Sequence, residues 1–274
     1  MKKTFFLIAI IALLSLPFSP GCGEDIRNES KKESMIEKAI RTGKIRIGMS
    51  TFLPWAMKDK KGELIGFEID VAKRLAEDMG VEAEFVQTKW AGIIPALITG
   101  KFDIIVGGMG ITPKRNLKVN FSIPYDHTGM SLVAGRKLSD GFTKLDDFNH
   151  PEITLTARMG STSVEAAKKY MPEAELRQFD DESQAIQEVL NGRAHGMVSS
   201  APLPAFQALK YPDRLFLPLE GNFTKEPIAF AVRKGDFDTC NFLNNWIRCV
   251  QAEGWFKERK HYWFETDEWQ ERVR

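Results

Sequence analysis

Short apolar runs and amphipathic segments alternate along the chain and predict strands and helices in turn. The first half has predicted helices at 35–41, before Gly80 and at 93–99, and predicted strands at 44–49, 82–87 and 103–106. The second half has predicted strands at 153–157, 175–179, 194–200, 213–218 and 228–232, and predicted helices after Met159, at 182–190 and at about 236–252. This spacing is typical of βαβ units, so we expect mostly parallel sheet with helices on both sides.

The alternation begins twice, once near Lys44 and again near Ile153, without obvious repetition of sequence. About 240 residues remain after the N-terminal leader described below, which is enough for two small lobes. Two α/β lobes leave a cleft between them, and ligands of open sheets bind at the carboxyl ends of the strands. The pattern therefore predicts an α/β protein with its binding site between two lobes.

The N-terminus has the features of an export signal. Lys2 and Lys3 precede an apolar run that is too short for a comfortable membrane span. Ser19-Pro20-Gly21-Cys22 resembles a bacterial lipoprotein signal, which makes Cys22 the candidate lipidated residue, although Ser19 stands where leucine is usual. We expect a signal peptide at 1–22 and a polar tether at 23–35, with a periplasmic or outer-surface location and no membrane contact beyond a lipid anchor. Ordinary cleavage to a soluble form is the alternative.

Composition narrows the function classes. The formal charge of +1 falls to −1 when the two leader lysines are removed, and nothing favours nucleic acid as a partner. Cys240 and Cys249 fall in one predicted helix, about 13 Å apart at 1.5 Å per residue, so we expect free, packed thiols. The four histidines lack metal-ligand spacing. We therefore expect no metal and no cofactor.

One stretch carries a candidate binding motif. In IIVGGMGITPKR, 104–115, a buried strand runs into three glycines, which permit a close approach to the backbone. Thr112 before Pro113 is typical of a helix start, and Arg115 can hold a carboxylate with two parallel hydrogen bonds. These features favour an anion site. The alternative is a glycine turn followed by a surface helix with a solvated arginine.

Longer segments resemble a known family. The stretches FLPWAMKDKKGELIGFEIDVAKRLAEDMG, KWAGIIPALITGKFDIIVGGMGITPKRNLKVNFSIPY and GWFKERKHYWF are similar to the periplasmic polar amino-acid-binding proteins of ABC transporters. The resemblance covers about 36–264 and implies the type II periplasmic binding fold, with two Rossmann-like lobes joined by two hinge strands. It implies a first lobe at 36–128 plus 231–274 and a second lobe at 133–226. It also implies a monomer that delivers a small carboxylate ligand to an ABC transporter permease.

The resemblance implies a set of ligand-binding residues. Arg115 holds the ligand carboxylate, with help from the glycine turn and from a serine and threonine turn in the second lobe. Phe52 and Trp90 stack over the ligand side chain, and Trp55 lies close by or packs in the core. Arg158 extends to a distal ligand group or into solvent. The complete set is Phe52, Trp55, Trp90, Gly108, Gly110, Thr112, Arg115, Arg158, Ser161, Thr162 and Ser200.

Two positions depart from the family pattern. Gly110 replaces the usual serine or threonine, which removes a hydroxyl donor. Ser200, in MVSSAP, replaces the aspartate that receives the ligand's α-ammonium. Because an unpaired buried charge is costly, the ligand is expected to be an organic acid without an amino group, or an amine held by another carboxylate.

Other functions compete with transport. A minority of this fold are enzymes, notably cyclohexadienyl dehydratases, which need an acid at the leaving hydroxyl. In those relatives a glutamate closely follows the second-lobe turn, where this chain has Val164, with Glu165 one residue further. A helix would rotate Glu165 about 100° from that place, so we expect a binding protein without catalytic residues. A sensory domain and a binder that has lost its ligand are the remaining alternatives.

Overall fold

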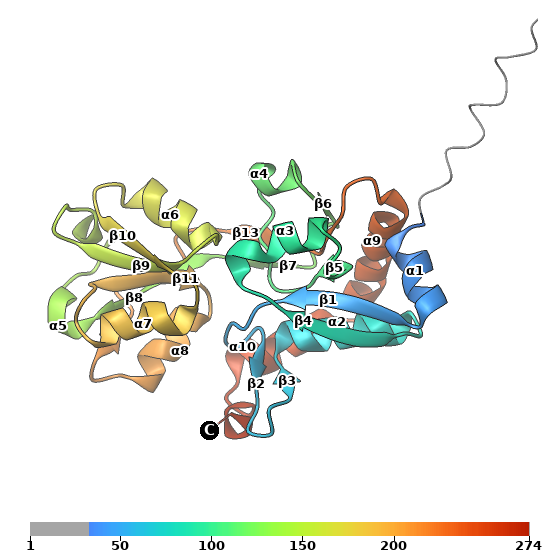
Figure 1. Ribbon diagram of the computed structural model, residues 1–274. Helices are drawn as coiled ribbons and strands as arrows, with labels where there is room; N and C mark the ends of the chain where they lie inside the picture. The colour runs from blue at the N-terminus through green and yellow to red at the C-terminus, as the bar shows by residue number, and fades with distance from the viewer. Residues whose placement is uncertain (1–32, 274) are drawn as a thin grey trace, which may run out of the picture. The chain divides into compact units, whose positions relative to one another are not determined.

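The computed structural model describes residues 33–273, of which 34–273 belong to one compact unit (Figure 1). The expected signal peptide, the tether up to residue 32 and the lipidation candidate Cys22 lie outside the described residues. None of the described helices is both long and apolar enough to cross a membrane. Two five-stranded sheets organise the described chain, and we call the sheets with their covering helices the first and second lobes.

The first lobe is built on a sheet with the strand order β4-β1-β5-β14-β6. Strands β4, β1 and β5 are parallel, whereas β14 runs antiparallel to both β5 and β6. Ile45 and Ile47 point to the same face of β1 and are both fully buried. The strands of this lobe are β1 (Lys44–Met49), β2 (Met57–Lys58), β3 (Leu64–Ile65), β4 (Glu82–Gln87), β5 (Ile104–Ile105), β6 (Asn120–Phe121) and β14 (Ala231–Val232).

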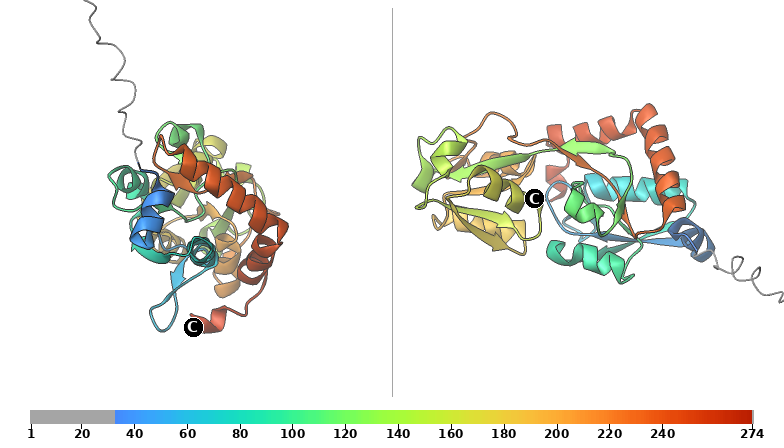
Figure 2. Two further views of the ribbon diagram at one scale, coloured as in Figure 1. Left: turned by 90° about the vertical axis from the view of Figure 1, so that its right-hand side faces the viewer. Right: turned by 90° about the horizontal axis from the view of Figure 1, so that it is seen from above.

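The helices of the first lobe come from both ends of the described chain. They are α1 (Met35–Thr42), α2 (Phe67–Asp78), η1 (Trp90–Gly92), α3 (Ile93–Ile98), α4 (Pro113–Asn116), α9 (Phe237–Ala252), α10 (Trp255–Glu265) and η3 (Gln270–Arg272). Helices α9 and α10 lie along this lobe, and α10 packs beside α2 (Figure 2). The indole N–H of Trp263 donates to Asp70 Oδ2 at 2.7 Å, which ties α10 to α2. The C-terminal segment therefore completes the lobe that the N-terminal half begins.

The second lobe repeats the same design. Its sheet has the order β10-β9-β11-β8-β12, with β10, β9 and β11 parallel and β8 and β12 antiparallel to their neighbours. Its strands are β8 (Met130–Gly135), β9 (Thr154–Arg158), β10 (Glu175–Phe179), β11 (Gly196–Ser200) and β12 (Leu215–Phe216). Its helices are α5 (Arg136–Ser139), η2 (Leu145–Phe148), α6 (Thr162–Tyr170), α7 (Glu182–Leu190) and α8 (Leu203–Lys210).

Two antiparallel strands join the lobes. Strand β7 (Asp126–Thr128) pairs with β13 (Glu226–Ile228), with Thr128 opposite Glu226. Strand β7 leads into β8 of the second lobe, and β13 leads back to β14 of the first (Figure 1). This is the expected α/β class of two Rossmann-like lobes joined by two hinge strands.

Two local expectations need correction. The strand predicted at 103–106 spans only Ile104 and Ile105, although the N–H groups of Asp103 and Val106 still donate to carbonyls of β1. Cys240 and Cys249 share α9 and are free, as expected, but only Cys240 is partly buried. Cys249 is exposed, so the prediction of two packed thiols is wrong for it.

Candidate functional site

The glycine turn after β5 lies against the core of the first lobe. Gly108 has a positive φ of 63°, and a Cβ there would come within 3.1 Å of Trp55 Cε3. Glycine is therefore required both by the backbone conformation and by the close approach of the indole ring. The turn also pairs with the hinge, because Gly110 forms a bridge with Ile228 and the N–H of Ile111 donates to the carbonyl of Pro227 at 2.9 Å.

Arg115 lies on the short helix α4 that follows the turn. Thr112 caps α4 by accepting from the N–H of Arg115 at 3.2 Å, and Pro113 is the first helical residue. Helix α4 is one turn long, so the guanidinium is the main attraction for an anion. Arg115 Nη1 donates to the carbonyl of Gly110 at 2.7 Å, and Nη2 donates to the carbonyl of Gly160 in the second lobe at 3.1 Å.

The electrostatics of Arg115 suit an anionic ligand. Burial lowers the pKa of its guanidinium, whereas the nearby carboxylates of Glu165 and Glu226 act in the opposite direction. A cation that has lost hydration is stabilised by any anion placed beside it. The arginine therefore lies where a ligand carboxylate would gain most from its charge.

The two aromatic side chains expected to face the ligand flank another arginine. The guanidinium carbon of Arg158 lies 4.9 Å from the ring centroid of Phe52 and 4.6 Å from that of Trp90. Arg158 is only 4% exposed, and its Nε and Nη1 have no hydrogen-bond partner among the described residues. A side chain of the second lobe thus fills the gap between two rings of the first.

Glu182, at the start of α7, is the counter-ion of Arg158. Its Oε1 lies 3.4 Å from Arg158 Nε, and both side chains are nearly fully buried. Burial raises the pKa of the Glu182 carboxyl, and the charge of Arg158 opposes this. Burial also lowers the pKa of Arg158, which Glu182 and Asp181 oppose. The pair is a buried charged centre in which two donors, Arg158 Nε and Nη1, and one acceptor, Glu182 Oε2, have no hydrogen-bond partner among the described residues.

Trp55 packs in the core of the first lobe. It is 2% exposed, stacks on Phe52 with 6.0 Å between ring centroids and meets Phe67 edge-on at 5.8 Å. These contacts correspond to the core-packing alternative and place Trp55 beneath the glycine turn. Trp55 thus contacts Phe52 and leaves no room for a side chain on Gly108.

The second-lobe turn faces the glycine turn of the first lobe. Ser161 precedes α6, and its hydroxyl donates to the carbonyl of Arg158 at 2.6 Å. Thr162 begins α6, and its Cγ2 lies 3.6 Å from the place that a Cβ of Gly110 would occupy. The structure therefore brings Thr162 and Gly110 together, and it uses the Ser161 hydroxyl within the chain.

Ser200 ends β11 opposite Met130, and it is partly buried. Its hydroxyl lies 3.9 Å from Met130 Sδ, which is a weak contact. No carboxylate stands at this position, so the departure seen in the sequence persists in the fold.

Further contacts between the lobes surround the site. Lys89, next to η1, pairs with Asp180 at the end of β10. Gly160 lies against Ala91 of η1, because a Cβ on Gly160 would be 2.9 Å from Ala91 Cα. The predicted site residues thus gather where the two lobes meet.

Two residues of this region were not among the predicted ones, namely Glu182 and Glu226. Glu226 begins β13, and its Oε2 is buried without a hydrogen-bond partner among residues 33–273. The run Asp180-Asp181-Glu182 at the carboxyl end of a predicted strand was a usable signal for the first of them. For Glu226 the sequence offered only a charged residue before Pro227 in a hinge strand.

Two pockets lie near the contact between the lobes. One is lined by Thr51, Phe52, Leu53, Ala56, Met57, Gln87, Asp181, Glu182, Ser183, Leu203 and Gln207. It has a volume of about 420 Å³ and gives access to Phe52 and Glu182 of the candidate site.

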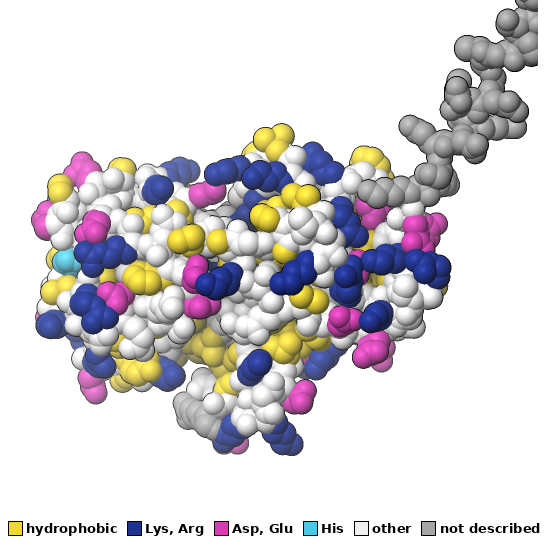
Figure 3. All heavy atoms as spheres, viewed as in Figure 1, with side chains coloured by type: hydrophobic (Ala, Val, Ile, Leu, Met, Phe, Trp, Pro, Cys, Tyr) yellow, Lys and Arg dark blue, Asp and Glu magenta, His cyan; other side chains and the backbone are white. Residues whose placement is uncertain are grey.

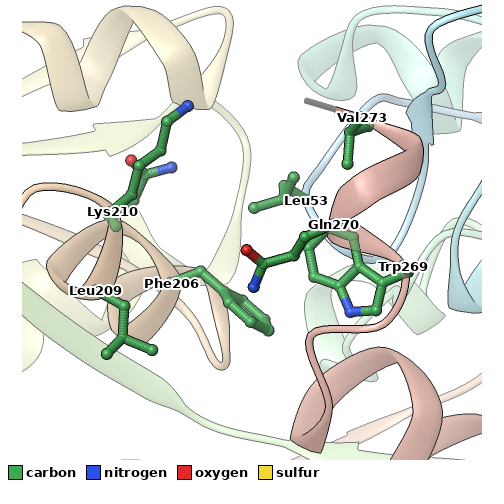
Figure 4. Close-up of a pocket in the computed structure, with 8 residues that line it drawn as sticks. Leu53, Phe206, Leu209, Lys210, Trp269, Gln270 and Val273 are labelled. Carbon is green, nitrogen blue, oxygen red and sulfur yellow. The ribbon is translucent and has the colours of Figure 1, made fainter.

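The second pocket lies between α8 and the C-terminal segment (Figure 4). It is lined by Leu53, Phe206, Gln207, Leu209, Lys210, Trp269, Gln270 and Val273, none of which is a predicted ligand-binding residue. Hydrophobic side chains gather in this region of the surface, whereas positive and negative side chains are mixed over the rest of the face shown in Figure 3. We therefore place the candidate site at the glycine turn and at Arg158, which lies between Phe52 and Trp90.

Comparison with known proteins agrees with the two-lobed fold. The family model of bacterial extracellular solute-binding proteins, family 3, matches residues 45–266. A Wolinella succinogenes protein, described as a binding component of an ABC transporter in complex with lysine, is 41% identical, with a TM-score of 0.78 over 84% of this chain and 99% of that one. An ancestral amino-acid-binding protein, described as a precursor of cyclohexadienyl dehydratase, is 39% identical, with a TM-score of 0.77 over 84% and 99%.

A catalytic relative matches over a greater length at lower identity. Cyclohexadienyl dehydratase of Pseudomonas aeruginosa is 23% identical over 267 residues, which is 97% of each chain. The family match, however, spans most of the described residues and both lobes. The chain belongs to the bacterial extracellular solute-binding proteins of family 3.

Proposed function

We propose that this protein binds a small amino acid or related organic acid outside the cytoplasm and delivers it, as a monomer, to the permease of an ABC importer. The family match and the transporter-associated relative in complex with lysine support the role in transport. The observation that carries the ligand class is Arg115, a largely desolvated cation at the glycine turn whose guanidinium spans both lobes. The α-carboxylate of the ligand binds there.

The far end of the ligand faces Arg158. Two of its guanidinium nitrogens lack partners, and its plane is held between Phe52 and Trp90. A ligand side chain that ends in an amide or carboxylate would accept from these donors, whereas a cationic one would meet like charge. We therefore propose ligands such as glutamine or glutamate in preference to lysine or arginine, in contrast to the relative that holds lysine.

A thermal-shift screen tests this function. Purified protein is heated with single amino acids, keto acids, dicarboxylates and aromatic precursors. A ligand present at 100 times its dissociation constant adds about 2.7 kcal/mol to the free energy of unfolding. We expect stabilisation by at least one carboxylate with a neutral or acidic side chain, and a lack of stabilisation by every compound in the panel would contradict the proposal.

The dehydratase is the second candidate, favoured by the relative that matches along 97% of the chain. Position 164, where such enzymes carry a glutamate, holds the buried Val164, and Glu165 one residue further is exposed. Incubation with prephenate and with arogenate, followed by detection of the aromatic product, separates the two functions. We expect no turnover.

The candidate lipid anchor at Cys22 gives a prediction about localisation. If Cys22 carries a lipid, Cys22→Ala expressed in a bacterial host moves from the membrane fraction to the soluble periplasm, because the thiol is the attachment point. Fractionation and immunoblotting of wild type and variant measure this. Wild-type protein already soluble in the periplasm would instead establish ordinary signal cleavage.

A buried acid below the glycine turn gives a pH prediction. Burial raises the pKa of Glu68 to about 8, although the Tyr125 hydroxyl and the Gly108 backbone act in the opposite direction. Tyr125 donates to both carboxyl oxygens at 2.9 Å. The folded protein thus keeps a proton that the unfolded chain loses near the ordinary pKa of 4.5, so folding stability falls as the pH rises from 4.5 to 8.

Glu68→Gln removes this titration while leaving an acceptor for Tyr125. Urea unfolding is measured at pH 5 and at pH 8. Between these two values, the free energy of unfolding of wild type should fall by about 3 to 5 kcal/mol more than that of the variant. Equal pH dependence in the two proteins would show that Glu68 does not hold the proton.

A further inference from the structure

We propose that Glu226 is the counter-charge for the α-ammonium of an amino-acid ligand, in place of the aspartate that is absent at Ser200. The inference rests on the proposed function, because it assigns the ligand carboxylate to Arg115 of the same site. It selects amino acids from the wider class of carboxylates.

Only one of the two carboxylate oxygens of Glu226 has a hydrogen-bond partner among the described residues. Its Oε1 accepts from the Thr224 hydroxyl at 3.1 Å, which fixes the orientation of the side chain. Its Oε2 is buried and has no partner in the described part of the chain. A buried carboxylate oxygen without a hydrogen-bond donor is energetically unfavourable, so a ligand N–H that donates to it would stabilise the complex.

The free oxygen and Arg115 face the same small space. A Cβ built on Gly110 would lie 3.2 Å from Glu226 Oε2 and 3.6 Å from Arg115 Nη1. An α-amino acid carries its ammonium and carboxylate on one carbon, so it needs an acid and a guanidinium side by side. Glu226 Oε2 and Arg115 Nη1 both lie beside Gly110, so an acid and a guanidinium stand next to each other there.

The same contact explains the missing hydroxyl at Gly110. A serine or threonine side chain there would press on Glu226 Oε2, since 3.2 Å is already tight for a Cβ. A side chain at position 110 would therefore require the Glu226 carboxylate to shift.

Glu226 and Ser200 are linked through Met130. The Thr224 hydroxyl that donates to Glu226 accepts from the N–H of Met130 at 2.8 Å. Ser200 contacts the sulfur of the same Met130 at 3.9 Å. The hinge strand that carries Glu226 and the strand end that carries Ser200 thus contact the same residue.

The other nearby acids are less suited to an ammonium. Glu182 has Arg158 as its counter-ion, 3.4 Å away between Oε1 and Nε. Glu165 influences Arg115 but is exposed to solvent. Glu226 alone among these three combines a buried free oxygen with a position beside Gly110.

Matched ligand pairs test the proposal by calorimetry. The probes are L-glutamine with glutaramic acid, L-glutamate with glutarate, L-phenylalanine with 3-phenylpropanoate, and L-lysine with 6-aminohexanoate. Wild type should bind the amino acid of the best pair at least tenfold more tightly than its deaminated partner. Glu226→Gln should reduce this preference at least tenfold, because it weakens binding of the amino acid and leaves binding of its deaminated partner unchanged. Binding of the deaminated partner shows that the variant is folded.

Glu165→Gln is the control, because it removes the other carboxylate that acts on Arg115 while leaving Glu226 in place. It should keep the wild-type preference. Adding Ser200→Asp to Glu226→Gln should restore the preference for the amino acid. A wild type without preference, an unchanged preference in Glu226→Gln, or an equal loss in Glu165→Gln would overturn the role of Glu226. Failure of every probe to bind wild type would instead overturn the proposed function itself.

Discussion

Replacing Arg115 by lysine is expected to weaken binding of the carboxylate ligand by about 10- to 100-fold, with the fold intact. Lysine keeps the charge but loses the planar fork that can hold both carboxylate oxygens. It also cannot donate at once to the carbonyls of Gly110 and Gly160, which lie on opposite lobes. The dissociation constants of wild type and variant, measured by calorimetry, give the result directly.

Arg248→Lys is the matched control for this substitution. Arg248 is exposed on α9 and donates to the side chain of Asn245 at 3.1 Å, so the same chemical change there should leave affinity unaltered. An Arg115→Lys variant that binds the ligand as tightly as wild type would show that Arg115 does not hold the ligand carboxylate with two hydrogen bonds.

A methyl group on Gly160 is expected to hold the lobes apart. Gly160→Ala would place a Cβ 2.9 Å from Ala91 Cα, a backbone atom of the other lobe that cannot rotate away. The carbonyl of Gly160 would then move away from Arg115, and Arg158 from the gap between Phe52 and Trp90. We expect the affinity for the ligand to fall at least tenfold, which is about 1.4 kcal/mol of binding free energy.

Gly100→Ala separates this clash from backbone strain. Gly100 has φ of 78° and Gly160 has φ of 75°, so an alanine pays a similar conformational cost at both, but a Cβ on Gly100 meets no atom within 4 Å. Both variants should lose comparable stability in denaturant, and only Gly160→Ala should lose affinity. Equal affinities for the two variants would show that contact of the lobes at Gly160 is not needed for binding.

Much of the fold could be predicted because local pattern and tertiary structure agree in this chain. The strand at 82–87, the helix at 182–190 and the cap formed by Thr112 and Pro113 all have the predicted bounds or roles. Each depends on neighbours within a few residues, which the sequence displays directly. The glycine turn was recognisable for the same reason.

The charge pairing of the site is not visible in the sequence. Arg158 and Glu182 meet only because β9 and α7 converge at one edge of the second sheet, and Phe52 and Trp90 come from the other lobe. The free oxygen of Glu226 depends on the crossing of the hinge strand over the glycine turn. Such contacts between distant residues are fixed by packing, so a motif can indicate that a carboxylate site exists without indicating which other charges share it.

The ligand's carboxylate provides the most direct test of the central claim, that Arg115 and the glycine turn receive it. Calorimetry should compare the tightest ligand from the thermal-shift screen with the same molecule in which the α-carboxylate is converted to a primary amide. The neutral amide is expected to bind wild type at least 100-fold more weakly than the acid does, which is about 2.7 kcal/mol of binding free energy. Because the amide lacks the charge that Arg115 holds, Arg115→Lys should weaken binding of the amide little further. An amide that binds wild type as tightly as the acid would contradict the account.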